Sequence, residues 1–315
     1  MIRLVLTRGF QGCIVLLLVS AIVYLLVNLA PGGPGALMRM DVTPEQREAL
    51  ARRLGLDQPL PIRYLAWLSG ALHGDLGSSL SSNEPVAFRI GQRLPNTLLL
   101  AGVALAVSVV LGIPMGVLGA LRRDSPADLL LALVSVLGVS IPAFWLGIML
   151  ILAFSVNLNW LPSSGTSSPG NEANLIDRAQ HLLMPALVLS TTVLPYVVRF
   201  TRSALLDVLH QDYVRTAAAK GLSETAVVYR HALRNALVPV VSIVGTQVPR
   251  LFGGAVVTEA VFGWPGMGRL AIEAANGRDY PLIVAITVFV AAVVVVTSII
   301  VDLAYTWLDP RIRLA

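Results

Sequence analysis

The amino-acid sequence predicts an all-α, polytopic integral membrane protein with about six transmembrane helices. Of its 315 residues, 56% are hydrophobic and 13% are charged, and the mean hydropathy is +0.75, far above the usage of soluble proteins. One soluble core cannot bury so many apolar side chains, whereas each helix that crosses a bilayer needs about 20 of them in sequence. The chain contains six stretches of this kind, so we expect six spans.

The six spans are recognised by their length, because a helix that is apolar on all sides shows no periodic stripe. They cover residues 12–30, 97–121, 129–156, 182–198, 237–262 and 281–308. We predict helices, since a backbone in lipid must satisfy its hydrogen bonds internally. Pro142 lies inside the third span, and Pro249, Gly253 and Gly254 are expected to interrupt the fifth. The alternative for the first stretch is a cleaved signal peptide, although about 19 apolar residues are long for one.

The distribution of basic residues predicts that both termini lie in the cytoplasm, because arginine and lysine collect in cytoplasmic segments next to membrane spans. With the N-terminus inside, the inner segments hold Arg3, Arg8, Arg122, Arg123, Arg199, Arg202, Arg215, Lys220, Arg230, Arg234, Arg311 and Arg313. The short outer loops hold Arg178, Arg269 and Arg278. The loop 31–95 carries seven arginines, but most of it is too far from a span for the rule to apply.

Two outer loops follow from this topology. The first, 31–95, contains HGDLGSS at residues 73–79, a glycine-rich polar turn. We interpret this turn as part of the outer-face architecture, with a ligand site as the alternative; it is too short and too far from a strand for a phosphate loop. The second loop, 157–180, is rich in Ser, Gly, Pro and Asn and predicts a flexible cap. Neither loop is large enough for a separate enzyme domain.

The residues that catalysis or metal binding would require are scattered. The four histidines, at positions 73, 181, 210 and 231, include no pair at the i, i+4 spacing of a zinc helix, and Cys13 is the single cysteine. Lys220, the single lysine, precedes a glycine instead of following one, so there is no P-loop. We therefore expect no catalytic residue, no metal and no cofactor on this chain. Energy for any transport must come from a partner or an ion gradient.

A charged segment, DYVRTAAAKGLSETAVVYRHALRNALVPV (212–240), lies between the fourth and fifth spans and faces the predicted cytoplasmic side. Its alanine-rich start predicts a helix that stops at Gly221, and Ser223 with Glu224 predicts the start of a second helix. The apolar positions of this second helix are Val227, Val228 and Leu233. Such a surface suits a groove on a partner protein, and an amphipathic helix that lies on lipid has nearly the same pattern.

This segment resembles the EAA loop of ABC importer permeases, whose pattern is Glu-Ala-Ala, three residues, Gly, nine residues and Ile-x-Leu-Pro. Ala217 and Gly221 keep the pattern, Arg215 and Thr216 depart from it, and residues 231–234 read HALR instead of Ile-x-Leu-Pro. The variant DYVRTAxAKGL followed by HALRNALVPV is similar to the dipeptide/oligopeptide/nickel branch. The resemblance implies a coupling loop, about 212–235, that docks on a partner ATPase through Arg215, Thr216, Ala217, Lys220, Gly221 and Leu222.

Further motifs of that branch extend the resemblance over nearly the whole chain. They are LAPGGP (29–34), LGLDQPLPIRYLAWL (54–68), HGDLGSS (73–79), RLPNTL (93–98), VVTEAVFGWPGMGRL (256–270) and LDPRIR (308–313). The resemblance implies that residues 1–95 form a first transmembrane helix and a long extracytoplasmic loop. It implies that residues 96–315 form a five-helix, MetI-like ABC importer permease core that contains the coupling loop.

The resemblance also implies partners and cargo. A homologous second permease subunit, two cytoplasmic ATPase subunits that bind ATP and Mg, and an extracytoplasmic substrate-binding protein would complete the transporter in the bacterial inner membrane. This chain would form half of a pathway that imports short peptides by alternating access, with nickel, glutathione or another small solute as the alternative cargo. An ion-coupled secondary transporter is the rival from another class, because it also needs buried charges.

Three charged residues within the spans are candidates for the translocation path or a gate, because charges at membrane depth are costly. Arg250 follows Pro249 about halfway along the fifth span, where it could bind a substrate carboxylate; the alternative is an internal ion pair or a water-filled cavity. Glu259 lies in a stretch typical of the family, which favours a structural or gating role. Asp302 is expected to pair with Arg199 or Arg202, first as a clamp of the bundle and second as a gate.

Overall fold

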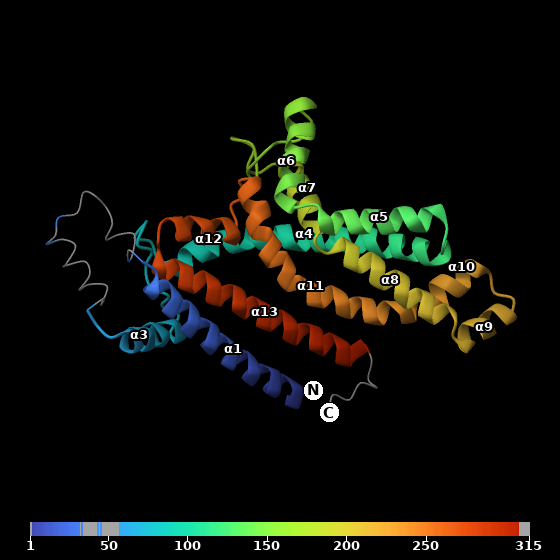
Figure 1. Cartoon of the computed structure of the whole chain (residues 1–315), viewed down its shortest axis with the longest axis horizontal. Coiled ribbons are helices and arrows are strands. Elements are labelled where there is room, and N and C mark those ends of the chain that lie inside the picture. Colours follow the sequence, from blue (N-terminus) through green and yellow to red (C-terminus); the bar gives the residue numbers. More distant parts are fainter. Residues whose placement is uncertain (1, 32, 34–42, 44, 46–56, 309–315) are drawn as a thin grey trace. The chain divides into compact units, whose positions relative to one another are not determined.

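The computed structural model describes residues 2–31, 33, 43, 45 and 57–308 of the chain. These residues form helices, with one isolated β-bridge between Ser78 and Pro85. The α-helices in Figure 1 are α1 (Ile2–Leu29), α3 (Leu60–Leu72), α4 (Val86–Leu121), α5 (Pro126–Ser140), α6 (Ala143–Leu150), α7 (Leu175–Ser190), α8 (Leu194–Leu209), α9 (Asp212–Ala219), α10 (Glu224–Ala226), α11 (Leu233–Val261), α12 (Met267–Asn276) and α13 (Tyr280–Leu308). Two π-helical segments are η2 (Ile151–Asn157) and η3 (Val227–Ala232). Lying partly or wholly outside the described residues are the motifs at 29–34, 54–68 and 308–313, with Arg311 and Arg313.

The helices have the length and composition of a multi-pass membrane protein. Four are long and apolar enough to cross a membrane: Val5–Leu29, Val86–Leu121, Glu224–Val261 and Tyr280–Leu303. Two further candidates are bent pairs, Pro126–Ser140 with Ala143–Asn157 at 103° and Leu175–Ser190 with Leu194–Leu209 at 55°. If each bent pair is one span, the described residues contain six candidate spans, in the predicted order.

Prolines act differently from the prediction in two spans. Pro142 does not lie within a continuous third helix, because α5 ends before it and its own backbone is extended (φ −60°, ψ 131°) ahead of α6. The expected interruption of the fifth span at Pro249, Gly253 and Gly254 is wrong, since α11 runs through these residues and through Pro239. In an apolar setting no water replaces the lost backbone bonds, so a helix that meets proline retains the remaining ones.

Contacts divide the chain into two units, which we describe separately. The first comprises Leu98–Trp264 with the described part of Thr297–Ala315, and the second comprises Ile2–Thr97 with Pro265–Val296. Helices α4 and α13 contribute residues to both units. The division of the sequence between residues 95 and 96 stays a prediction.

In the first unit, α4 contacts α8 through glycine residues. Gly112, Gly116 and Gly119 lie on the side of α4 that faces α8. A Cβ atom at Gly116 would lie 2.6 Å from Cβ of Thr201 and 2.7 Å from the carbonyl oxygen of Val198, which is closer than side chains approach. Small residues let the backbones of two membrane helices come this close. One side of α8 is therefore buried against α4.

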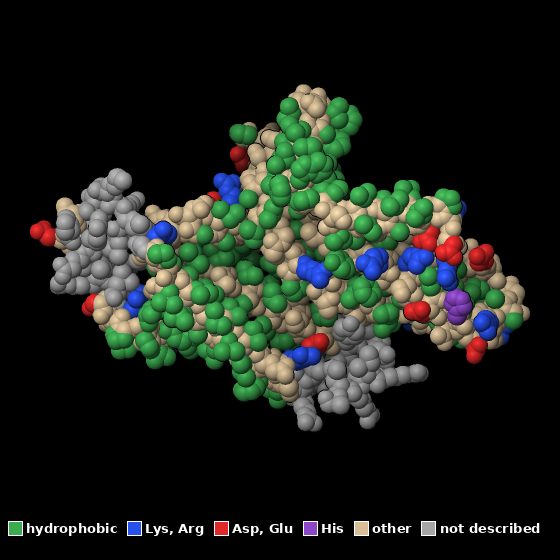
Figure 2. Space-filling model, in the orientation of Figure 1, with side chains coloured by type: hydrophobic (Ala, Val, Ile, Leu, Met, Phe, Trp, Pro, Cys, Tyr) green, Lys and Arg blue, Asp and Glu red, His purple; other side chains and the backbone are tan. Residues whose placement is uncertain are grey.

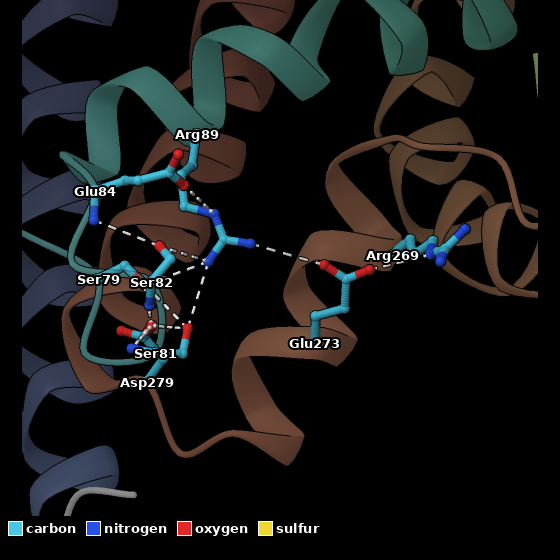
Figure 3. A network of polar contacts seen from close by, with 8 residues as sticks. All are labelled: Ser79, Ser81, Ser82, Glu84, Arg89, Arg269, Glu273 and Asp279. Carbon is cyan, nitrogen blue, oxygen red and sulfur yellow. Dashed lines mark hydrogen bonds and ion pairs between the residues drawn. The ribbon is translucent and has the colours of Figure 1, made fainter. Parts of the chain in front are cut away.

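In the second unit, a buried carboxylate connects an outer turn to the junction of α12 and α13. Asp279 is fully buried and accepts hydrogen bonds from Oγ of Ser79 and from Oγ and the backbone N–H of Ser81. Arg89, near the start of α4, donates to Ser79 Oγ. The other members of this network are Ser82, Glu84, Arg269 and Glu273 (Figure 3). Because Ser79 ends the HGDLGSS motif, these contacts favour an architectural role for that turn.

Candidate functional site

The predicted coupling loop forms two helical pieces joined by a sharp turn beyond the end of α8 (Figure 1). Lys220 caps α9, and Gly221 follows with a φ of +81°, a conformation that glycine adopts without steric cost. The N–H of Gly221 donates to the carbonyl of Ala218 at 3.0 Å. Ser223 Oγ then accepts a hydrogen bond from the N–H of Ala226 and caps α10. The predicted helix, turn and helix are present, and the second helix continues through η3 into α11.

The apolar side of this loop is buried within the chain. Val227 and Val228, which are 6% and 3% exposed, lie in one cluster with Ala217 of α9 and Leu205 of α8, and Leu233 packs against it. The expectation that Val227, Val228 and Leu233 offer an apolar surface to a partner or to lipid is therefore wrong. These side chains instead attach the loop to α8 and to the inner end of α4.

The outward side of the loop carries most residues that the resemblance assigns to docking. Exposed are Arg215, Thr216, Lys220, Gly221 and Leu222. Ala217, which keeps the EAA pattern, is 6% exposed and belongs to the buried cluster. Arg215 and Thr216, which depart from that pattern, occupy surface positions where side-chain size is not restricted. Leu222 and Tyr229, 43% and 58% exposed, are large apolar side chains left on this surface.

Two candidates for the translocation path lie on opposite sides of α11. Arg250 is exposed, and its guanidinium lies 4.5 Å from the ring centroid of Tyr196 on α8, a cation–π contact. Among the residues that the structure describes, no carboxylate lies within salt-bridge distance of Arg250, which argues against the internal ion pair. Glu259 is fully buried. Nine residues correspond to about half a turn around the axis at about 100° per residue, so Arg250 and Glu259 cannot face the same path.

Arg202 is bound by Asp128, a residue that the sequence analysis does not single out. Nε and Nη2 of Arg202 donate to the two carboxylate oxygens at 2.8 and 2.7 Å, and Asp128 is 8% exposed. The expected pairing of Asp302 with Arg199 or Arg202 is wrong for the described part of the chain, because Arg202 is held by Asp128 and Arg199 forms no ion pair there. The Arg202–Asp128 pair lies beside an open groove of about 960 Å³ between α5 and α8.

We expect Asp128→Ala to lower the stability of the first unit by about 2 kcal/mol. Removal of one partner from a buried ion pair typically costs 3–5 kcal/mol, and the partial exposure of Arg202, 34%, reduces this cost. Thermal unfolding of the purified protein in detergent measures the effect. Asp124→Ala is the matched control, because Asp124 is 82% exposed and contacts an exposed arginine; surface pairs contribute little. Equal melting temperatures for the two variants would contradict a clamp between α5 and α8.

Comparisons with known proteins agree with these features. Residues 112–314 match the family model described as binding-protein-dependent transport system inner membrane component, and residues 1–101 match the model for the N-terminal part of such components. The oligopeptide transport system permease protein AppB of Bacillus subtilis is 43% identical over 312 residues, 98% of each chain. The dipeptide transport system permease protein DppB of Escherichia coli K12 is 39% identical over 318 residues, 94% of each chain.

A solved structure shares the fold. The MetNI methionine ABC transporter in an inward-facing conformation matches with a TM-score of 0.58 at 19% identity, over 70% of this chain and 97% of that chain. At this identity the likeness concerns the fold alone, and it agrees with the predicted MetI-like core. Both family models and both relatives cover the greater part of the chain. The chain therefore belongs to the family of binding-protein-dependent transport system inner membrane components, and it is a multi-pass protein of the inner membrane.

Proposed function

We propose that this chain is a permease subunit of an ATP-driven ABC importer and forms half of a translocation pathway for short peptides. The observation that supports the cargo most directly is the similarity, over 98% and 94% of the chain, to permeases named for oligopeptides and dipeptides. Nickel, glutathione or another small solute is the alternative cargo within the same transporter class. A substrate-binding protein determines much of the choice among them.

The proposed transporter contains a homologous second permease, two cytoplasmic ATPase subunits and an extracytoplasmic binding protein. The family description, an inner membrane component of a binding-protein-dependent system, supports a separate protein that delivers the cargo. ATP and Mg are bound by the ATPase subunits, and this chain contributes no catalytic residue. In the described residues, no group of three His, Cys, Asp or Glu side chains is arranged to hold a metal ion.

The coupling loop transmits the movement of the ATPase to the spans. Its exposed residues, among them Arg215, Lys220 and Leu222, form the docking surface. Its buried side packs on Leu205 of α8, and its second helix continues into α11. A displacement of the loop therefore moves the ends of α8 and α11 together. The same two helices carry Tyr196 and Arg250, so closure of the ATPase acts on the candidate path.

Purification of the assembled transporter tests this function. We expect a tagged chain, extracted gently from its native membrane, to bring with it a second permease and two ATPase subunits, detected by intact-complex mass and by ATP hydrolysis. After reconstitution with the binding protein, the vesicles are expected to accumulate a labelled dipeptide in an ATP-dependent manner. Nickel ions serve as the control cargo. A lone chain without ATPase activity, in conditions that keep a known ABC importer assembled, would contradict the proposal and favour an ion-coupled transporter.

A further inference from the structure

The two sides of α8 differ in chemistry. One side is buried toward α4 and carries Val197, Thr201 and Leu205. The other side, half-buried at its first residue and exposed beyond it, carries Tyr196, Arg199, Ser203, Asp207 and His210. At about 100° per residue, these five positions fall within an arc of about 80° around the helix. They form a continuous row along α8, which we call the polar stripe.

The charged residues of the polar stripe have no ionic partner among the described residues. Arg199 has no carboxylate within salt-bridge distance, and Asp207 has no basic group within that distance. Yet α8 belongs to the bent pair Leu175–Ser190 with Leu194–Leu209, a candidate membrane span. Unpaired charges in a span are costly unless they face water. This side of α8 therefore faces a hydrated space instead of lipid.

Arg250 of α11 meets the polar stripe at its first residue. Its guanidinium lies over the ring of Tyr196, and Arg199 follows Tyr196 after about one helical turn. Gly253, the next exposed position of α11 after Arg250, has open space around it, because a Cβ atom there would have no neighbour within 4 Å. Figure 2 shows basic side chains spaced along the surface over α8. Two unpaired arginines thus lie about one turn apart where α8 and α11 adjoin.

We propose that the polar stripe lines the cytoplasmic half of the translocation path, and that Arg250 and then Arg199 bind the carboxylate of the passing cargo. This inference rests on the proposed import function. A guanidinium binds a carboxylate through paired, charge-assisted hydrogen bonds. Two such sites about one turn apart let the carboxylate move from one cation to the next. Asp207 lies about 12 Å beyond Arg199, at 1.5 Å per residue, and offers no further anion site, so release follows there.

Cysteine labelling tests the location of the stripe. Cys13 is the single cysteine of the chain, so Cys13→Ala gives a background in which Ser203→Cys reports one position. In inside-out vesicles that hold the whole transporter, we expect a membrane-impermeant maleimide to label Ser203→Cys at rest. Labelling is expected to fall by about fivefold when a non-hydrolysable ATP analogue closes the ATPases, as alternating access requires. Leu133→Cys, at an exposed apolar position of α5, is the control and stays unlabelled in both states.

Two labelling results would overturn the inference. No labelling of Ser203→Cys means that the stripe faces lipid or a subunit interface. Equal labelling in both nucleotide states means that the stripe lies permanently in the cytosol, where Arg199 would simply extend from the inner end of the span to water.

Substitution of the arginines tests the carboxylate sites. We expect Arg199→Gln and Arg250→Gln each to lower uptake of a dipeptide with a free carboxylate by about tenfold, equivalent to about 1.4 kcal/mol. Uptake of the same dipeptide as its C-terminal amide is expected to change less than about twofold, because the amide makes no ionic contact. Arg178→Gln, at an exposed position of α7 on the predicted outer side, is the control and leaves both rates unchanged.

The outcomes separate this inference from the import function. If the wild-type transporter takes up the dipeptide and both variants take up the free acid at the wild-type rate, the carboxylate sites are overturned while peptide import stands. If the wild-type transporter takes up no peptide, the proposed function fails and the carboxylate sites fail with it. The location of the stripe is still decided in that case, because the labelling of Ser203→Cys needs only the nucleotide.

Discussion

Replacement of Gly221 by proline lowers ATP-driven uptake by about tenfold or more, a factor that corresponds to a loss of about 1.4 kcal/mol in docking, while the permease stays folded. The φ of Gly221 is +81°, whereas proline restricts φ to about −65°. Proline also removes the N–H that donates to Ala218. The turn must therefore rebuild, and this displaces the neighbouring Leu222 from the docking surface. The buried cluster of the loop is separate from the turn, so α8 and α11 remain attached.

Gly170→Pro is the matched control for this variant. Gly170 has a φ of +83°, it lies in open space, and its N–H donates one hydrogen bond, to Glu172. The substitution thus causes the same kind of backbone damage on the predicted outer side, far along the chain from the coupling loop. We measure dipeptide uptake, ATP hydrolysis and co-purification of the ATPase for both variants. Wild-type uptake with Gly221→Pro would remove the basis for the coupling-loop assignment.

Local signals explain why much of the fold and the loop could be predicted. An apolar stretch of about 20 residues has few alternatives to a membrane helix, and Gly221 with Ser223 marks a helix stop and a helix start by backbone chemistry alone. The start of α5 is equally readable: Ser125 caps the N–H of Asp128, and Pro126 occupies the first turn. Such patterns act within a few residues, so they survive whatever the rest of the chain does.

Contacts between distant residues could not be predicted in this way. The apolar pattern of Val227 and Val228 requires a partner, but it does not say whether the partner is another protein, lipid or the same chain. The bond between Arg202 and Asp128 joins residues 74 positions apart, and no local pattern couples them.

The polar stripe illustrates a boundary error. The predicted fourth span ends at residue 198, which cuts the stripe between Tyr196 and Arg199, whereas α8 continues to Leu209. The spacing of its polar residues becomes visible once the helix is extended. Charged residues at the end of an apolar run were assigned to the cytoplasm by the basic-residue rule, which gives no information about which side of the helix they occupy.

Gly116→Leu is expected to prevent stable packing of α4 on α8 and to destabilise the first unit by about 3 kcal/mol or more. Overpacking usually costs 1–3 kcal/mol, because neighbouring side chains shift. Here one of the obstructing atoms is the backbone carbonyl oxygen of Val198, 2.7 Å from a Cβ atom at this position, which cannot move without α8. The amount of folded protein recovered in detergent, its melting temperature and dipeptide uptake measure the effect.

The control for Gly116→Leu is Gly102→Leu, because Gly102 is an exposed residue of the same helix with no neighbour within 4 Å of a Cβ atom. Leucine there is expected to leave the melting temperature unchanged or to raise it, since leucine favours a helix more than glycine does. A second change, Thr201→Gly, removes the side-chain part of the contact at Gly116. It is expected to restore only a fraction of the lost stability, because the carbonyl oxygen of Val198 remains. Full recovery would mean that side chains alone set the distance between α4 and α8, and that their backbones are free to separate.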